Sequence, residues 1–289
     1  MNTAILSILS GLGGMFGWGI YDFLGGVYSK QIGPFKSFFW SQLAGLISAF
    51  LLIFVFPINL KVPIPVILLL PIAAIIYSAG YLFFFKGFEI GNVSIVAATM
   101  NLWTVFTMLF AFIFMGQRLS TIQSLGVLMI ISGVTLASLK WSDIRNQRFQ
   151  LSSGVKETVL GAFFFGVFWN ISEVISEKIG WLSTTLLVKF GIVLFLLLFS
   201  ILVKRELDLT KATAKTKCVV VVMGIIEAGA VAIVNYGLTI GDAILITPIA
   251  SALSIVTITL AIIFLKDNVT KLQGLGIITA IAGIIVTAF

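Results

Sequence analysis

Apolar runs, each about 18 to 25 residues long, alternate with short charged or Gly/Pro-containing breaks along the whole chain. The runs lack the period-two alternation of apolar and polar residues that is typical of barrel strands. Because a backbone in lipid must satisfy its own hydrogen bonds, runs of this length are expected to be transmembrane helices. The pattern predicts an all-α integral membrane protein with ten transmembrane helices, at residues 4–28, 36–57, 64–85, 93–115, 122–139, 157–177, 185–203, 218–238, 243–265 and 272–288.

The composition agrees with this fold class. Hydrophobic residues make up 60% of the chain and charged residues 10%, and the mean hydropathy is +1.17. A soluble domain carries about 25% charged residues, so this chain lacks the polar side chains to cover a globular surface. The net charge of +7 comes mainly from lysines and arginines between the apolar runs, which indicates contact with a lipid bilayer and not with nucleic acid. Since the sequence has no histidine, we expect no His metal site and no histidine proton relay. We also expect no cofactor.

The second half of the chain repeats the first. FEIGNVSIVAAT at 88–99 matches LTIGDAILITPI at 238–249, and FAFIFMGQRLSTIQSLGVLMIISG at 110–133 matches LAIIFLKDNVTKLQGLGIITAIAG at 260–283. An offset of 150 residues aligns these segments, and an offset of 147 residues aligns the first helices of the two halves. We call two residues related by either offset repeat mates. The mates include Gly19 with Gly166, Gln123 with Gln273, Gly126 with Gly276, and Gly133 with Gly283.

These matches divide the chain into a first repeat at 1–139, a basic linker at 140–156 and a second repeat at 157–289. Each repeat holds five predicted helices. Because five is odd, the second repeat enters the membrane in the opposite sense to the first. The sequence therefore predicts two inverted five-helix repeats, an architecture whose substrate site typically lies near the membrane midplane between the repeats.

The segment LWTVFTMLFAFIFMGQRLSTIQSLGVLMIISGV at 102–134 resembles the motif that ends each repeat of EamA-like transporters, a branch of the drug/metabolite transporter (DMT) superfamily. With five plus five predicted helices, the resemblance extends over nearly the whole chain. It implies a membrane transporter and not an enzyme. Its motifs say little about the substrate.

The chain departs from the pattern of that family in two respects. The family often has a glutamate where this chain has Gln117 and Asp267, which weakens the argument that acids matter at these positions. It often has a proline where this chain has Thr104 and Ser254. Pro248 offers another place for a kink in the ninth predicted helix.

Two arguments about orientation disagree. The loops after the first, third, fifth, seventh and ninth helices hold most of the lysines and arginines, whereas the loops of the opposite side hold Lys61, Arg118 and Lys178. The positive-inside rule would place the richer side in the cytoplasm and both termini outside. The resemblance to EamA-like transporters implies cytoplasmic termini instead. The sequence leaves both orientations open.

Five ionisable residues fall within predicted helices, where charge is costly and usually has a function or a partner. They are Asp22, Glu173, Glu177, Lys189 and Glu227. Glu177 lies near a helix end beside Lys178 and is expected to reach the lipid headgroups. The other three carboxylates are candidates for binding a substrate or a coupling ion.

Asp22 and Glu173 each follow a tryptophan by four residues, Trp18 and Trp169, so each acid shares a helix face with an indole. Trp169 is also the repeat mate of Asp22, which predicts that the two acids differ by about one turn, roughly 5 to 6 Å. We expect them to face a central cavity where carboxylates hold a cation or proton and indoles bind an ammonium group. The alternative is that the acids make structural hydrogen bonds and the tryptophans form an interfacial belt.

Glu227 has Tyr77 as its repeat mate, and Tyr81 lies one turn beyond it. The mate of Lys189 is Gln42. Because an intramembrane charge is usually paired, Lys189 is expected to form an ion pair with one of the glutamates, either Glu227 or Glu173. Further candidates for lining the site are Tyr21, Asn101, Trp103 and Asn170.

The function predicted from these features is secondary transport of a small organic metabolite by alternating access, coupled to a proton or a sodium ion. Three acids against one lysine favour a cationic or zwitterionic solute such as an amino acid or amine. A neutral sugar or drug carrier of the same superfamily remains an alternative, and a membrane channel is an alternative of a different class. No G-x-x-x-x-G-K-[ST] motif occurs, so ATP-driven transport by this chain is not expected. The expected location is a prokaryotic plasma (inner) membrane, and the protein is expected to be a monomer or a homodimer.

Overall fold

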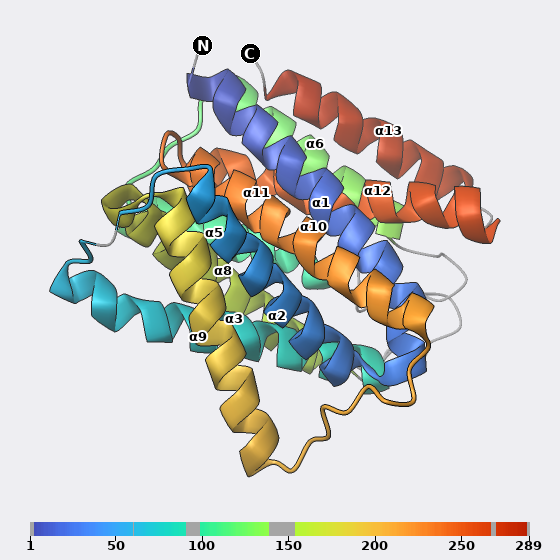
Figure 1. Cartoon of the computed structure of the whole chain (residues 1–289). Helices are drawn as coiled ribbons and strands as arrows, with labels where there is room; N and C mark the ends of the chain where they lie inside the picture. The colour runs from blue at the N-terminus through green and yellow to red at the C-terminus, as the bar shows by residue number, and fades with distance from the viewer. Residues whose placement is uncertain (1–2, 60, 91–98, 139–153, 267–269, 288–289) are drawn as a thin grey trace.

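The computed structural model describes residues 3–59, 61–90, 99–138, 154–266 and 270–287 (Figure 1). All regular structure within these ranges is helical. The helices are α1 (Thr3–Ile32), α2 (Pro34–Leu51), η1 (Leu52–Phe54), α3 (Ile64–Ile90), α5 (Leu102–Phe114), α6 (Thr121–Ser138), α8 (Val155–Ile179), α9 (Trp181–Leu202), α10 (Ala214–Leu238), α11 (Ala243–Ser251), α12 (Leu253–Leu260), η2 (Ala261–Leu265) and α13 (Lys271–Val286).

The helices follow the predicted apolar runs closely, and the all-helical membrane fold is confirmed. Among the described residues, seven helices are long and apolar enough to cross a membrane, compared with the ten predicted. The fourth, fifth and tenth predicted helices correspond to shorter apolar helices at Leu102–Phe114, Thr121–Ala137 and Lys271–Val286. The number of membrane crossings is therefore confirmed only in part.

Several sequence features lie outside the described ranges. The linker expected at 140–156 is described only from Gly154 onward, and Val155 already begins α8. Residues 91–98, which carry most of the first repeated segment, and Asp267 are also outside these ranges. Nothing in the structure bears on them.

The ninth predicted helix is interrupted after Pro248. Its first part, α11, contains Pro248 and ends at Ser251, and α12 begins at Leu253. Proline has no N–H to donate to the preceding turn, and its ring crowds the carbonyl of that turn. These effects act before Pro248, whereas the break at Ala252 lies four residues after it, so the proline does not account for the position of the break.

The two repeats interlock through close backbone approaches at glycines. Helix α6 packs along α13, its counterpart in the second repeat, and the pair forms one side of the bundle in Figure 1. A Cβ added to Gly133 would lie 2.4 Å from the nitrogen of Ala280, and one added to Gly276 would lie 2.5 Å from the nitrogen of Ala137. In lipid, where helices gain nothing from excluding water, small residues of this kind let backbones meet.

Contacts between the repeats occur in symmetry-related pairs. When two residues meet across the repeats, their repeat mates also meet. A Cβ on Gly19 would lie 2.5 Å from Val256, and a Cβ on its mate Gly166 would lie 2.4 Å from Phe106, the mate of Val256. In the same way α1 packs along α10, and α8 packs along α3. Such doubled contacts are what an approximate twofold axis between the repeats produces. The two offsets found in the sequence are thus both realised in the packing.

Helices α1 and α8 run in opposite directions. Helix α1 is antiparallel to α10, because Gly13 approaches Ile233 whereas Gly25, farther along α1, approaches Met223. Helix α8 is parallel to α10, because Ser172 contacts Asn235, whereas Phe165, earlier on α8, contacts Tyr77, the partner of Glu227, which is earlier on α10. The C-terminal halves of α1 and α8 therefore lie toward opposite ends of the bundle.

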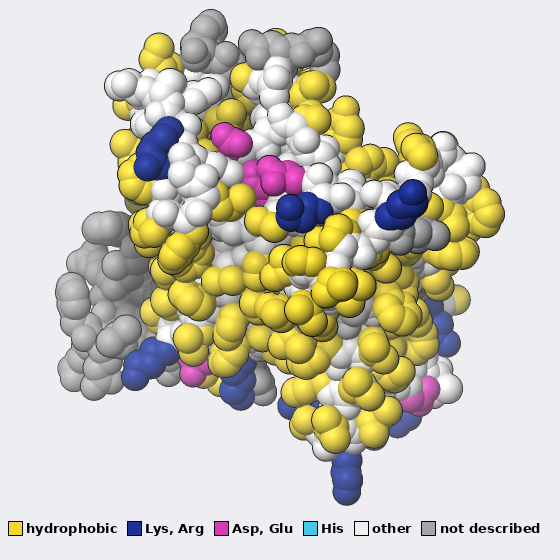
Figure 2. Space-filling view, turned by 90° about the vertical axis from the view of Figure 1, so that its left-hand side faces the viewer, with side chains coloured by type: hydrophobic (Ala, Val, Ile, Leu, Met, Phe, Trp, Pro, Cys, Tyr) yellow, Lys and Arg dark blue, Asp and Glu magenta, His cyan; other side chains and the backbone are white. Residues whose placement is uncertain are grey.

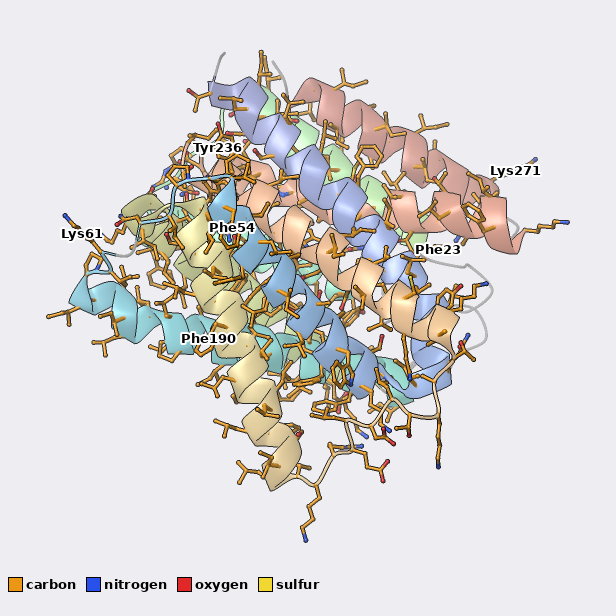
Figure 3. The ribbon with its side chains drawn as sticks, viewed as in Figure 1. Phe23, Phe54, Lys61, Phe190, Tyr236 and Lys271 are labelled. Atoms are coloured by element: carbon orange, nitrogen blue, oxygen red, sulfur yellow. The ribbon has the colours of Figure 1, made fainter. Side chains whose placement is uncertain are left out.

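The outer surface has the character expected of a protein in a bilayer. Figure 2 shows a face whose middle is covered by hydrophobic side chains, with basic and acidic side chains above and below them. Phe54 and Phe190 are 75% and 57% exposed, and Figure 3 shows them on the outside of the bundle. Lys61 and Lys271, both exposed, lie at its periphery. Apolar exposure on this scale is stable where lipid and not water covers it.

Gly133→Ala should destabilise the protein, because the added methyl group would lie 2.4 Å from the nitrogen of Ala280 and push α6 and α13 apart. Overpacking of this kind costs about 1–3 kcal/mol. The matched control is Gly274→Ala on α13, where a Cβ meets nothing within 4 Å and where alanine favours the helix. Thermal unfolding in detergent measures both. Equal melting temperatures for the two variants would contradict this packing.

Candidate functional site

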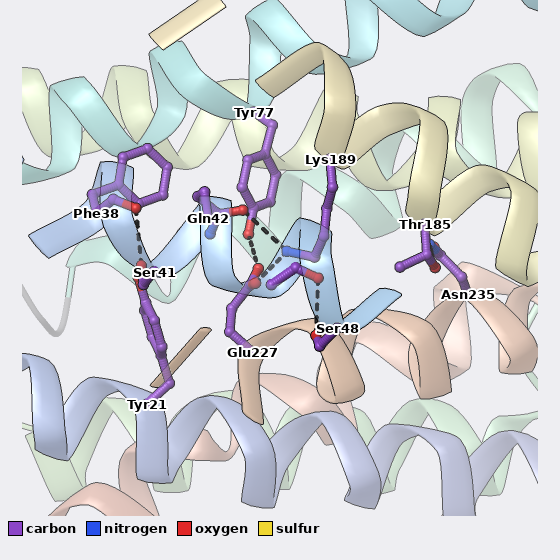
Figure 4. Close-up of polar contacts among 11 residues, drawn as sticks. Tyr21, Phe38, Ser41, Gln42, Ser48, Tyr77, Thr185, Lys189, Glu227 and Asn235 are labelled. Atoms are coloured by element: carbon purple, nitrogen blue, oxygen red, sulfur yellow. Dashed lines mark hydrogen bonds and ion pairs between the residues drawn. The ribbon is translucent and has the colours of Figure 1, made fainter. Parts of the chain in front are cut away.

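A buried polar cluster joins two helices of each repeat at the centre of the bundle (Figure 4). It consists of Gln42 on α2, Tyr77 on α3, Lys189 on α9 and Glu227 on α10, and we call it the lysine site. The Lys189 ammonium donates to Glu227 Oε2 and, at 3.0 Å, to Gln42 Oε1. The Tyr77 hydroxyl donates to Glu227 Oε1 at 2.8 Å. None of the four residues is more than 3% exposed.

The lysine site is built from repeat mates that contact each other. Gln42 is the mate of Lys189, and Tyr77 is the mate of Glu227. Two mates can touch only where they lie close to the axis that exchanges the repeats. The site therefore lies on that axis. Sequence reasoning left the partner of Lys189 open between Glu173 and Glu227, and in the structure the partner is Glu227.

The local packing brings the backbone of α2 close to α10 at this site. A Cβ on Gly45 would lie 2.9 Å from the carbonyl oxygen of Gly224 and 3.3 Å from Lys189 Nζ. The two glycines thus leave room for the lysine head. The amide nitrogen of Gln42 is buried and has no hydrogen-bond partner in the described structure. The site consequently has one donor that no described residue accepts from.

Asp22 lies on α1, directly after a tyrosine that contacts α2 beside the lysine site. It is half-buried, and it makes no hydrogen bond or ion pair with any other residue that the structure describes. The hydroxyl of that tyrosine, Tyr21, shares a hydrogen bond with Ser41, the residue before Gln42. The rings of Tyr77 and Tyr81 are 5.1 Å apart. We call Tyr21, Tyr77 and Tyr81 the tyrosine wall.

The three predicted tryptophans meet in one cluster. Trp18, Trp103 and Trp169 come from α1, α5 and α8, and their ring centroids are 5.2 to 6.5 Å apart. Each is 3% to 6% exposed, so these indoles do not form an interfacial belt at the lipid surface. Phe168 contacts both Trp169 and Tyr77, at 4.9 and 4.7 Å between centroids. Aromatic contacts therefore run without a break from this tryptophan cluster to the lysine site.

Glu173 belongs to a separate polar group, which we call the glutamate clamp. Its Oε1 accepts a hydrogen bond from Gln117 Nε2 at 2.7 Å and from the backbone nitrogen of Ala243 at 3.3 Å. Gln117 Oε1 in turn accepts from the nitrogen of Ile244 at 3.1 Å. The clamp thus ties the segment after α5, in the first repeat, to α8 and the start of α11, in the second. Glu173 is fully buried, and its Oε2 has no hydrogen-bond partner among the described residues.

The expectation that Asp22 and Glu173 lie about one turn apart is wrong. Both acids follow a tryptophan of the central cluster by one turn along the chain, but α1 and α8 run in opposite directions. Asp22 and Glu173 therefore diverge toward opposite ends of the bundle. Asp22 lies next to Tyr21, which contacts α2 beside the lysine site, and Glu173 lies with Gln117 and the start of α11.

The predicted asparagines have structural contacts. Asn170 donates from Nδ2 to the carbonyl oxygens of Gly166 and Thr107, at 2.8 and 3.1 Å. Its Oδ1 is buried and has no partner in the described parts of the chain. Asn101, 8% exposed, directly precedes α5. Asn170 therefore fixes α8 against α5, and its amide oxygen has no partner among the described residues.

Sequence reasoning missed two contributors. Gln117 was noted only as a departure from the family pattern, yet it is the main partner of Glu173. Ser41, one residue before Gln42, shares a hydrogen bond of 3.1 Å with the Tyr21 hydroxyl. No sequence signal singles out Ser41. A signal for Gln117 did exist, because a long polar side chain directly after an apolar helix can fold back toward a buried acid.

Lys189→Met should destabilise the protein strongly, because it leaves the Glu227 carboxylate buried without its cation. Breaking a buried ion pair on one side costs about 3–5 kcal/mol. The double variant Lys189→Met/Glu227→Leu should recover most of the lost stability, since neither charge remains. Thermal unfolding of a double-mutant cycle measures this, with exposed Lys178→Met as the control. A double variant no more stable than Lys189→Met alone would contradict the pairing.

Comparison with known proteins places this geometry in a family. The model of the EamA-like transporter family matches residues 5–139 and, separately, residues 152–289. A search of curated proteins finds no match. Among solved structures, 29 chains match, and one of them, described only as "Crystal structure of protein", superimposes with a TM-score of 0.79. That structure is 17% identical and covers 97% of this chain and 94% of its own, so it shows a shared fold.

The two family matches coincide with the two halves that exchange contacts across the lysine site. Each half is thus one copy of the family's repeat, and together the two matches cover all of the sequence except residues 1–4 and 140–151. The chain belongs to the EamA-like transporter family, whose members are membrane transporters of the DMT superfamily.

Proposed function

We propose that this protein is a secondary active transporter that carries a small organic solute between its two repeats by alternating access. The observation that carries the proposal is the lysine site, where mates from the two repeats contact each other through buried charged and polar groups. A rocking motion of one repeat against the other would act across these contacts. The proposal includes the ten membrane crossings and the inverted topology predicted from the sequence.

The balance of buried charge favours a cationic or zwitterionic solute. Lys189 and Glu227 neutralise each other, which leaves Asp22 and Glu173 as carboxylates without a cationic partner among the described residues. An amine would add a positive charge near Asp22, and the tyrosine wall would contact its apolar part. The carboxylate of an amino acid would additionally find Lys189 and the unused Gln42 amide. No arginine falls within a predicted helix, which argues against a phosphorylated solute.

The proposed driving force is the gradient of a proton or a sodium ion. Asp22 is the proposed site for the positive charge of the substrate or for the coupling ion, because it is half-buried and has no partner among the described residues. The proposed setting is the plasma (inner) membrane of a prokaryote, with the protein as a monomer or homodimer.

A neutral sugar is the second candidate, and the tryptophan cluster favours it. Indoles stack on sugar rings, and the ring centroids of Trp18, Trp103 and Trp169 lie within 6.5 Å of one another. A sugar would not need Asp22 for binding. The response of transport to loss of the Asp22 charge therefore separates the two substrates.

Proteoliposomes that contain the purified protein should take up a cationic or zwitterionic solute in a saturable manner, faster with a pH gradient than without one. The screen covers amino acids, quaternary amines and simple sugars. Asp22→Asn should reduce the uptake at least about tenfold, as expected when an ion-paired contact worth 1.4 kcal/mol or more is lost. Radiolabelled uptake measures the rates.

The control is Glu177→Gln, an exposed acid on α8 that should transport as the wild type does. If the protein takes up a neutral sugar and Asp22→Asn does not change that uptake, the proposal of a transporter stands. The proposal of a cationic or zwitterionic substrate is then contradicted. Flux that neither saturates nor follows an imposed gradient would indicate a channel instead.

A further inference from the structure

The glutamate clamp is the feature that the proposed substrate site does not explain. It lies at the end of the bundle where α5 and α8 end and α11 begins. Its members come from both repeats, because Gln117 belongs to the first and Glu173 to the second. Contacts of this kind hold one end of a two-repeat transporter closed and must break when that end opens.

The strength of the contacts in the clamp depends on whether the Glu173 side chain is charged. Glu173 accepts from an amide side chain and from the first residue of α11, Ala243. A helix N-terminus has a partial positive charge, so it attracts a carboxylate more strongly than an uncharged acid. Hydrogen bonds to a charged acceptor are also about twice as strong as bonds to a neutral one. The strength of the clamp therefore depends on the charge of Glu173.

The second carboxylate oxygen of Glu173, Oε2, indicates which ion the clamp binds. Oε2 is fully buried and has no partner in the described structure, and a carboxylate oxygen in that position is costly unless something binds it. The hydroxyl of Ser176, one turn along α8, is likewise buried without a partner. A metal ion would need several oxygen ligands, and the described residues contain no group of three or more His, Cys, Asp or Glu. A proton needs one lone pair, which Oε2 has.

We propose that Glu173 is a proton-binding latch between the two repeats. With the carboxylate charged, the clamp holds Gln117 and the start of α11 together and this end stays closed. When Oε2 takes a proton from the solvent at this end, the acceptor at Oε1 weakens, the attraction to α11 is lost and the end opens. The proton returns to solvent before the clamp forms again. This inference rests on the proposed alternating access and adds the group that controls one of its two gates.

Other charged groups surround the latch. Asp242 directly precedes α11, and Glu177 lies one turn farther along α8; their charges act on Glu173. Arg118 follows Gln117 but is engaged elsewhere, because its guanidinium donates to the carbonyl oxygens of Phe112 and Gln117. Asp242 and Glu177 are both exposed, so Glu173 is the buried acid on whose charge the clamp depends.

The test measures opening directly and does not depend on a substrate. Spin labels are attached at exposed Ile122→Cys on α6 and Tyr236→Cys on α10, with Cys218, the only native cysteine, changed to serine. Distances between the labels are measured by pulsed electron spin resonance in lipid nanodiscs at pH 8 and pH 5. The wild-type background should shift toward longer distances at pH 5. Glu173→Gln should show the longer distances at both pH values, because its side chain cannot become charged.

The control is Glu157→Gln, which removes an acid in the first turn of α8, at the other end of the helix, and should keep the wild-type pH response. If Glu173→Gln fails to fold, Gln117→Leu removes the other side of the clamp and should likewise show the longer distances at both pH values. A wild-type distance distribution that does not change with pH, or a pH response that persists in these variants, would overturn the latch. If the distances respond but no solute is transported, the latch stands and the proposed function fails; if transport occurs without a distance response, the reverse holds.

Discussion

The ion pair between Lys189 and Glu227 is the interaction on which the arrangement of the helices depends. A single charge in an apolar bundle is expensive, and a pair is tolerated only when both charges and their remaining hydrogen-bonding groups are satisfied. Here Gln42 and Tyr77 complete the pair, so helices α2, α3, α9 and α10 must meet at one point. The glycines Gly45 and Gly224 allow that approach. The polar centre and the small-residue packing around it are therefore one structural requirement.

The internal repeat is symmetric in its packing and asymmetric in its charges. Several packing glycines are matched by glycines across the repeats, such as Gly19 with Gly166 and Gly133 with Gly283, but every ionisable residue in the core of a helix has an uncharged mate. The pairs are Asp22 with Trp169, Glu173 with Gly26, Lys189 with Gln42, and Glu227 with Tyr77. Two like charges on the twofold axis would repel each other, whereas a charge and a polar mate can form a hydrogen bond. Both mate pairs at the lysine site take this form.

The sequence predicts features that depend on local or periodic patterns, and it does not predict features that depend on three-dimensional packing. Helix positions and repeat offsets follow from apolar runs and matched glycines, which are local or periodic. The partner of Lys189 needs the position of the twofold axis, which packing determines. The relation of Asp22 to Glu173 was misjudged because the register of the mates was considered without the direction of their helices. Gln117 could not be predicted from charge, because its amide is neutral. Its role comes from its contact with Glu173, which only the structure shows.

The asymmetry of charge also bears on the two states of a transporter. If two inverted repeats were identical, the states open to either side would be related by the twofold axis and equal in free energy. The glutamate clamp breaks this equality, because the mate of Glu173 is Gly26, where a Cβ would meet nothing within 4 Å. A hydrogen bond to a charged group contributes about 1.5–3 kcal/mol, enough to favour one state by a factor of about 10 to 100. A single acid on an otherwise symmetric scaffold can therefore set the resting side of the protein, and a group that binds that acid can reverse the preference.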